Sequence, residues 1–134
     1  MTQAPIIEVQ GLTRGYPRTS QPIFSNLYLK IEKHDFVFVI GESGVGKTTL
    51  VKFLIRQLQP PVRAIFHQKE DIARLTTAEV QAYRRNIGVV HQDFKLIEWK
   101  NVWQNIAYPL QIIGIDSDIV AQRVDQLLHQ FGLD

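Results

Sequence analysis

The feature that most constrains this chain is a glycine-rich segment from Gly41 to Thr48, GESGVGKT, which fits the pattern G-x-x-x-x-G-K-[ST]. An unbroken apolar run at residues 36–40 leads into it and predicts a strand covered on both faces in a parallel sheet. Apolar residues at spacings of three and four follow it and predict an amphipathic helix over residues 47–58. A strand, a glycine-rich turn and a helix in this order are typical of a phosphate-binding loop.

The residue types in this segment suit a polyphosphate. Glycines at positions 41, 44 and 46 let the backbone N–H groups point inward, and no side chain there keeps phosphate oxygens away. The positive end of the following helix adds to the attraction. We predict that Lys47 places its charge between the β- and γ-phosphates, that the Thr48 hydroxyl binds Mg²⁺, and that Thr49 donates to an α-phosphate oxygen.

We therefore predict that the chain binds ATP with Mg²⁺. The predicted nucleotide-binding residues of the loop are Gly41, Glu42, Ser43, Gly44, Val45, Gly46, Lys47, Thr48 and Thr49. The alternative is a glycine-rich turn with a chance lysine, which the strand and helix on either side disfavour. A GTP-binding switch protein would also need the motifs N-K-x-D and D-x-x-G, and neither occurs in the sequence. This test does not exclude a small-molecule kinase, although no acceptor-substrate site is recognisable.

The rest of the pattern is that of an α/β protein. Strands are predicted at residues 6–9 and 12–16 and around the alternating Leu27, Leu29 and Ile31, with a turn between antiparallel strands at 16–22. Further strands are predicted at 62–66 and 87–90. A helix is predicted from a capping box at Thr76 and Glu79 to Arg85. Two more are predicted at 101–110, with Val102, Ile106 and Leu110 on one face, and at 117–131, with Gly132 as C-cap.

Composition and charge exclude several classes of protein. With 134 residues, 45% of them apolar, the chain can bury one core, so one domain or part of one is expected. A net charge of +2 without a block of like charge gives no reason to propose nucleic acid as a partner. No apolar stretch approaches the roughly 18 residues that span a bilayer, so a cytoplasmic chain is expected.

Two further segments narrow the family. Tyr16 lies ahead of the loop, where an aromatic ring could stack on adenine, and Gln92 stands at a strand end in the sequence VVHQDF. Together with RRNIG just upstream and NVWQNIA downstream, these segments resemble the first half of an ABC-type ATPase domain, over residues 7–133. Within that superfamily the sequence resembles the FtsE group of cell-division ATP-binding proteins and their lipoprotein-export relatives.

The resemblance implies an α/β P-loop NTPase fold, namely the N-terminal portion of an ABC-type nucleotide-binding domain. It implies an antiparallel β region at residues 1–35, a P-loop core with part of the parallel sheet at 36–91, and the start of a helical subdomain at 92–134. By the same resemblance, Tyr16 stacks on the base and Gln92 meets Mg²⁺ and the attacking water. Lys47 and Gln92 are then the catalytic residues, and Thr48 and Gln92 the metal ligands. Taken alone, Gln92 suits a surface hydrogen-bonding role equally well.

The resemblance also implies a membrane partner. The stretch from Asp93 to Tyr108, with Trp99 and Trp103, is expected to dock a cytoplasmic helix of a transmembrane subunit, either FtsX-like or a permease. Core packing is the alternative for the tryptophans, and one of the two is expected to be core. The chain is accordingly expected at the inner face of the cell membrane, held there by its partner, and as a homodimer when full length.

The sequence departs from the family pattern in several places. Glu42, Val45 and Thr48 stand where proline, alanine and serine are common, which changes little. Residues 59–69 lack the glycines that usually form a tight turn and strand, so a rearranged arm is expected. No two glycines are adjacent, so an L-S-G-G-Q signature loop is impossible. A Walker B strand ending in Asp-Glu and a switch histidine are also missing.

Two functions stay open. In the first, the chain is the N-terminal half of an ATPase subunit of a membrane complex in division or export, present here as a truncated gene product or a fragment. In the second, it is a non-hydrolysing nucleotide-binding module that docks a membrane protein. Both predict ATP binding with little or no turnover by this chain alone. The reason is that the water-polarising glutamate and the signature loop are missing.

Overall fold

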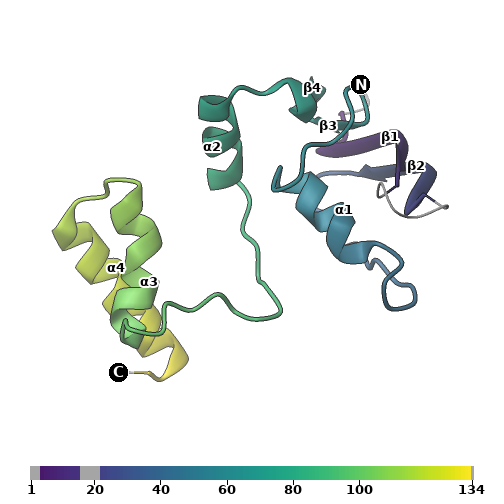
Figure 1. Ribbon diagram of the computed structural model, residues 1–134. Coiled ribbons are helices and arrows are strands. Elements are labelled where there is room, and N and C mark those ends of the chain that lie inside the picture. The colour runs from purple at the N-terminus through teal and green to yellow at the C-terminus, as the bar shows by residue number, and fades with distance from the viewer. Residues whose placement is uncertain (1–3, 16–21, 134) are drawn as a thin grey trace. The chain divides into compact units, whose positions relative to one another are not determined.

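The computed structural model describes residues 4–15 and 22–133, which belong to two compact units, Met1–Gly88 and Val89–Asp134 (Figure 1). The first unit holds the strands β1 (Ile7–Arg14), β2 (Phe24–Ile31), β3 (Ile65–His67) and β4 (Glu70–Asp71), the helices α1 (Lys47–Leu54) and α2 (Thr77–Arg85), and a 3₁₀ turn at Ile72–Arg74. The second unit holds α3 (Val102–Ile112) and α4 (Ser117–Phe131). Each unit has its own hydrophobic cluster. The domain division inferred from the sequence stays a prediction.

The four strands form one antiparallel sheet in the order β2-β1-β3-β4. β1 joins the two strands predicted at 6–9 and 12–16 into one strand with a bulge. Gly11 lies at φ 58°, and the pairing with β2 shifts on either side of Leu12. Glycine adopts this conformation without the steric cost that a Cβ brings. The predicted antiparallel β region is confirmed.

β2 alternates as the sequence predicts. Leu27, Leu29 and Ile31 are half-buried, and Tyr28 and Lys30 between them are exposed. The strand therefore packs on the core with one face and meets solvent with the other. Most of the turn predicted between β1 and β2, including Tyr16, lies outside the described residues.

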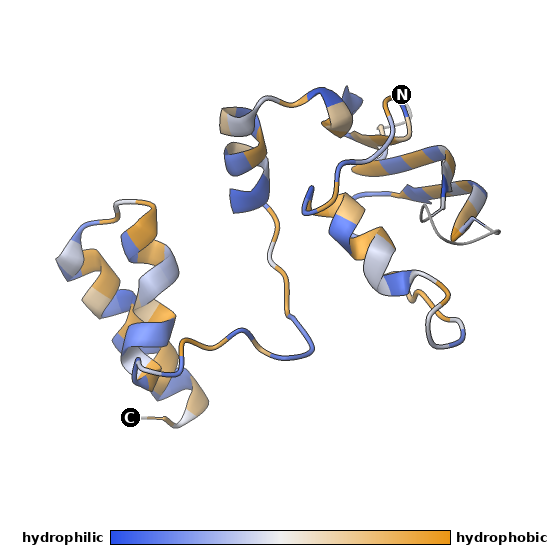
Figure 2. Ribbon diagram, viewed as in Figure 1, coloured by the Kyte–Doolittle hydropathy of each residue, from blue (hydrophilic) through white to orange (hydrophobic). Residues whose placement is uncertain are grey.

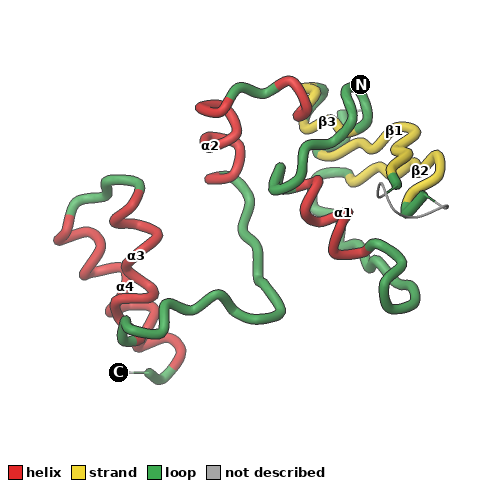
Figure 3. The backbone as a smooth tube through the Cα atoms, in the orientation of Figure 1, coloured by secondary structure: helices red, strands yellow, loops and turns green. Residues whose placement is uncertain are grey.

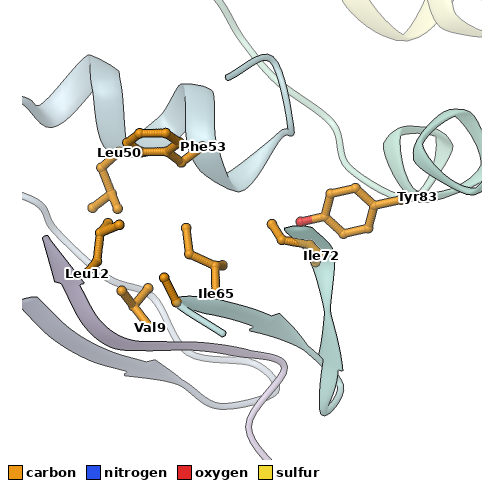
Figure 4. Close-up of a cluster of buried hydrophobic side chains, with 8 residues drawn as sticks. Val9, Leu12, Leu50, Phe53, Ile65, Ile72 and Tyr83 are labelled. Atoms are coloured by element: carbon orange, nitrogen blue, oxygen red, sulfur yellow. The ribbon is translucent and has the colours of Figure 1, made fainter. Parts of the chain in front are cut away.

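Helix α1 packs on the sheet through Leu50 and Phe53, which are 5% and 2% exposed. Figure 4 shows both side chains facing Val9 and Leu12 of β1, with Ile65 of β3 in the same cluster. A spacing of three places the two helix residues on one face, as predicted. Full burial of side chains of this size contributes roughly 1.5–3 kcal/mol each, so this contact anchors the helix to the sheet.

The helix ends at Leu54, earlier than the predicted residue 58. Ile55 is the C-cap residue, and Arg56 follows in a left-handed conformation with φ 56°. Leu58 still packs against the cluster from beyond the helix end. The apolar spacing overstates the helix because the following turn also faces the core.

Two segments predicted as buried strands, residues 36–40 and 87–90, are loop in the structure (Figure 3). Phe36 and Ile40 are 84% and 88% exposed, and Val90 is 91% exposed. A strand of a parallel sheet is buried only when other strands flank it and helices cover both faces. The described part of the chain supplies neither. These two predictions, and with them the predicted part of the parallel-sheet core, are wrong for this structure.

β3 and β4 form a hairpin with the two-residue turn Gln68 and Lys69, whose φ values are 48° and 73°. A two-residue turn with both φ positive normally selects asparagine and glycine. β3 starts at Ile65 and overlaps only the end of the strand predicted at 62–66. The tight turn thus forms without glycine, and a rearrangement of the arm at 59–69 relative to the family stays a prediction.

Local capping residues define the remaining helices. Thr76 and Glu79 form the predicted capping box of α2, in which Glu79 Oε2 accepts the Thr76 N–H at 2.7 Å. Asn101 and Gln104 form an equivalent box at the start of α3. α4 has the predicted bounds and ends at Gly132, which has φ 64°.

Helices α3 and α4 pack through Ala107, Val120 and Val124, each at most 1% exposed. Figure 2 shows apolar and polar residues alternating around both helices, as amphipathic packing requires. Val102 is 56% exposed, whereas Ile106 and Leu110 of the same predicted face pack against the cluster. No helix in the described ranges is long and apolar enough to cross a bilayer.

Candidate phosphate-binding site

The glycine-rich loop leads directly into α1, with Gly46 as the N-cap residue. Gly44 and Gly46 have φ of 81° and 109°, a region that glycine adopts most readily. No described side chain caps this helix end, and the first turn holds no acidic residue. The backbone N–H groups at the start of α1 are therefore open to an anion.

Gly46 is buried, and the packing around it excludes a side chain. A Cβ on Gly46 would lie 2.4 Å from Cγ2 of Ile23 and 3.1 Å from a ring carbon of Phe24. A Cβ on Gly44, by contrast, would meet nothing within 4 Å. The start of β2 thus packs against the loop backbone and holds the head of α1 on the sheet.

Lys47, the first residue of α1, folds back over the loop. Its Nζ donates to the carbonyl oxygens of Gly41 and Glu42, each at 2.7 Å. The side chain thereby places a positive charge at the same helix end as the uncapped amides. An oxyanion bound by those amides would meet this charge, and the pairing would be charge-assisted.

Thr48 and Thr49 lie in the first turn of α1, the former exposed and the latter half-buried. The Thr48 hydroxyl is a hard oxygen donor, which suits Mg²⁺, an ion that keeps several waters and shares phosphate oxygens. Across the ranges that the structure covers, no three His, Cys, Asp or Glu side chains gather into a metal site. The Thr48 hydroxyl is chemically suited to a magnesium ion that also binds phosphate oxygens.

Two cavities border α1. The larger, about 290 Å³, lies beside Lys47 and Ile40 and is lined mainly by apolar side chains. The smaller, about 120 Å³, lies between Thr49 and Gly15 at the end of β1. Tyr16 follows Gly15 in the sequence but lies outside the described residues, so its stacking on a base stays a prediction.

Gln92 belongs to the second unit and is exposed at the start of a turn. Beside it, Lys95 Nζ lies 2.6 Å from Asp93 Oδ2, and the hydrogen bond from Lys95 lowers the pKa of the Asp93 carboxyl. Both side chains are exposed, so this ion pair contributes little stability. The amide oxygen of Gln92 is a suitable ligand for Mg²⁺, and its catalytic and metal-binding roles stay predictions.

The two tryptophans of the predicted docking stretch have different surroundings. Trp99 is 85% exposed. Trp103 packs against the cluster of α3 and α4, and its Nε1 donates to Asp125 Oδ1 at 2.9 Å. Trp103 is half-buried, so it borders the core of this unit without belonging to its fully buried residues. Phe94 and Leu96 are exposed as well, so apolar side chains gather on this stretch.

Asn105 is a structural determinant of this stretch that the sequence reasoning missed. From α3, its Oδ1 accepts the N–H of Ile97 at 2.8 Å, and its Nδ2 donates to the carbonyl oxygens of Ile97, Lys100 and Asn101. These bonds hold the loop that carries Trp99 against the start of the helix. The available signal was an asparagine inside a helix, where its side chain competes with the backbone.

The sequence pattern of the ABC transporter family matches residues 24–134. The chain belongs to this family. It is 36% identical over 131 residues to the methionine import ATP-binding protein MetN 3 of Oceanobacillus iheyensis. This alignment covers 96% of this chain and 38% of that protein. It is 33% identical to the cell division ATP-binding protein FtsE of Mycobacterium tuberculosis, covering 96% of this chain and 56% of the relative. The chain is also 33% identical to FtsE of Bacillus subtilis, in an alignment that covers 92% of this chain and 54% of that protein.

The expected likeness to FtsE is confirmed, and the chain is similar to MetN to a similar degree. Among solved structures, cbiO1 from Clostridium perfringens, part of the ABC transporter complex cbiONQ, matches with a TM-score of 0.80 at 23% identity, covering 98% of this chain and 52% of that one. Dimeric MJ0796 bound to ADP and Pi matches with a TM-score of 0.78 at 23% identity. This match covers 92% of this chain and 56% of that one. The ABC fold class is therefore confirmed. This chain spans 38% to 56% of the length of the relatives named here.

Proposed function

We propose that this chain binds Mg-ATP through residues 41–49, as the N-terminal portion of an ABC ATPase subunit. The observation that carries the proposal is the head of α1, where the Lys47 ammonium and the uncapped amides lie at the end of a glycine-rich loop. A polyphosphate gains from both the charge and the helix dipole. Membership of a family that binds ATP supports the same ligand.

Each residue has a role in this proposal. Lys47 neutralises the β- and γ-phosphates, and Thr49 donates to the α-phosphate. Thr48 and Gln92 supply oxygen ligands to Mg²⁺, while Tyr16 stacks on the base. The magnesium ion, when bound, screens the phosphate charge and orients the phosphate chain.

The proposal includes little or no ATP turnover by this polypeptide alone. The sequence contains neither a signature loop nor a Walker B Asp-Glu pair. Water polarisation and charge stabilisation of the transferred phosphate would both be incomplete. A steady-state phosphate-release assay on the 134-residue chain should therefore stay at background. Release at the rate of full-length ABC ATPases would contradict this part of the proposal.

In the cell, the subunit acts at the cytoplasmic face of the membrane with a transmembrane partner. The FtsE relatives favour cell division, or export, with an FtsX-like partner, and the MetN relatives favour import with a permease. The partner contacts Asp93 to Tyr108, since Phe94, Leu96 and Trp99 expose apolar side chains there. Dimeric MJ0796 supports a homodimer of the longer protein. A non-hydrolysing module on the same surface is the alternative.

Calorimetry of the chain with Mg-ATP tests the central claim. The wild type should give heat of binding, and Lys47→Ala should abolish it, because the loop loses the ammonium group that lies over it and would pair with the phosphates. Lys52→Ala is the matched control, since Lys52 lies in the last turn of the same helix. Retained binding in Lys47→Ala, or no heat from well-folded wild type, would rule the proposal out.

A further inference from the structure

The C-terminal end of α1 is tied to α2 by side chains. The hydroxyl of Tyr83 donates to the Leu54 carbonyl oxygen at 2.5 Å. Nε of Arg84 donates to the Ile55 carbonyl oxygen at 3.0 Å, and its Nη2 donates to that of Arg56 at 2.7 Å. Two neighbouring residues of α2 therefore hold three successive carbonyl groups at the end of the helix that follows the phosphate loop.

These contacts act as a helix cap supplied from a distant part of the chain. Carbonyl groups at a helix end lack intrahelical partners and carry the negative end of the helix dipole. The guanidinium of Arg84 is planar and permanently charged, so it suits two carbonyl acceptors at once. Tyr83 is 7% exposed, and burial raises its pKa to about 12, so its hydroxyl keeps the proton that it donates.

The turn after α1 explains why side-chain donors are needed. Arg56 lies in the left-handed region at φ 56°, so the backbone leaves the helical path there. Its own guanidinium points elsewhere, and Nε donates to the Ile72 carbonyl oxygen at 2.7 Å. Nε2 of Gln59 donates to the Ala73 carbonyl oxygen at 2.8 Å. The end of α1 is thus fixed from α2 and from the 3₁₀ turn.

The two ends of α1 are mechanically linked because the helix is short. Its eight residues span roughly 12 Å. Leu50 and Phe53 hold it on the sheet by apolar contacts, which are not directional. The hydrogen bonds from α2 are directional, so they define the axis and the rotation of the helix. A change at this end therefore alters where the amides at Gly46 and beyond point.

We propose that Arg84 is a positioning residue for nucleotide binding, assisted by Tyr83, and that it sets the direction of the phosphate-binding amides by holding the far end of α1. The inference rests on the proposed binding of Mg-ATP at the loop. Both residues act through α1. Their effect on the loop depends on the geometry of their hydrogen-bond donors. Removal of the neighbouring positive charge of Arg85 should therefore not reproduce it.

The test compares variants of α2 in the full chain. Arg84→Gln removes the charged fork, Arg84→Lys keeps the charge and N–H donors but not the planar fork, and Tyr83→Phe removes one hydroxyl. Arg85→Gln is the matched control, because Arg85 is the exposed neighbour and makes no hydrogen bond to α1 among the described residues. Calorimetry gives the affinity for Mg-ATP. Amide ¹H–¹⁵N resonances of Gly44 and Gly46, recorded without nucleotide, report the loop geometry directly.

Arg84→Gln should weaken Mg-ATP binding about tenfold, since two charge-assisted hydrogen bonds to the helix end are lost. The same variant should shift the resonance of Gly46 in the nucleotide-free chain. Tyr83→Phe should produce both effects more weakly, and Arg85→Gln neither. Arg84→Lys should recover only part of the affinity, because an ammonium group lacks the planar fork.

A purely structural cap gives a different result. If Arg84→Gln is less stable but keeps both the glycine resonances and the Mg-ATP affinity below its melting temperature, the inference is overturned. If Arg84→Gln does not fold, the milder Tyr83→Phe decides by the same two readouts. A wild-type chain that fails to bind Mg-ATP would overturn the proposed function instead, and the glycine resonances would still decide whether Arg84 positions the loop.

Discussion

The pair of helices in the second unit and the segment at residues 36–40 in the first unit have equally clear apolar patterns but different structures. α4 has the predicted bounds, and its Val120 and Val124 are buried against Ala107. In the segment, Phe36 and Ile40 are almost fully exposed. A helix forms its backbone hydrogen bonds internally, so one neighbour is enough to bury its apolar stripe. A parallel strand needs neighbours on both edges and both faces, so its pattern alone does not build it.

Phenylalanine shows the same contrast within the first unit. Phe53 is 2% exposed, between the sheet and α1, whereas Phe36 and Phe38 are 84% and 78% exposed. Phe36 and Phe38 contact each other edge to face, with ring centroids 5.0 Å apart. Residue type is therefore a poor guide to burial here, and the elements that surround the residue decide it.

The largest expected effect tests this contrast directly. Phe53→Ala should lower the free energy of unfolding by about 3–5 kcal/mol, because it leaves a cavity beneath α1. Phe36→Ala should change it by less than about 0.5 kcal/mol, because a mostly exposed ring loses few contacts. The free energy of unfolding of both variants can be measured in urea, with hydrogen exchange of the β1 and α1 amides as the readout. Equal losses for the two variants would show that Phe36 is buried in solution and would break the comparison.

The loop provides the next test, because two of its glycines have different surroundings. Gly46→Ala should cost about 2–4 kcal/mol, the sum of a clash with Ile23 and a left-handed backbone. Gly44→Ala should cost about 1 kcal/mol, since only the backbone strain remains. Thermal unfolding of both variants gives the difference. A smaller loss for Gly46→Ala than for Gly44→Ala would mean that the start of β2 does not pack on the loop.

Much of the fold follows from local signals in the sequence. The capping boxes at Thr76 and Asn101 and the αL residue Gly132 fix helix ends through contacts within a few residues, so the helices α2, α3 and α4 are found close to their predicted bounds. The bulge at Gly11 and the tight turn at Lys69 escaped prediction. Both depend on strand pairing with distant residues, which periodicity does not report.

The candidate site divides in the same way. The residues from Gly41 to Thr49 were identifiable because the motif is contiguous and the mechanism dictates each residue type. The clash that makes glycine necessary at Gly46 comes from Ile23 and Phe24, which precede the motif by about twenty positions, and no spacing rule connects them. The bonds of Arg84 to the end of α1 are equally remote in sequence.

In the second unit, Asn105→Ala should have an intermediate effect. It removes the side chain that holds the loop before α3 through bonds to Ile97, Lys100 and Asn101, at a cost of about 2 kcal/mol. Thermal unfolding followed by tryptophan fluorescence suits this unit, because both tryptophans lie in it. Gln111→Ala, at an exposed position of the same helix, should leave the transition unchanged. No shift for Asn105→Ala would show that the loop is held by other contacts.

The smallest expected effect is a gain in stability at the hairpin of the first unit. Lys69 holds φ 73° in the two-residue turn, so Lys69→Gly should relieve strain and raise the free energy of unfolding by about 0.5–1 kcal/mol. Lys33→Gly, at a turn position whose own φ is not positive, should instead lower the free energy of unfolding by about 0.5 kcal/mol, because glycine has more freedom when unfolded. Chemical unfolding of the two variants compares the signs. A loss in both variants would mean that the turn at Gln68 and Lys69 carries no strain that glycine relieves, although both residues have positive φ.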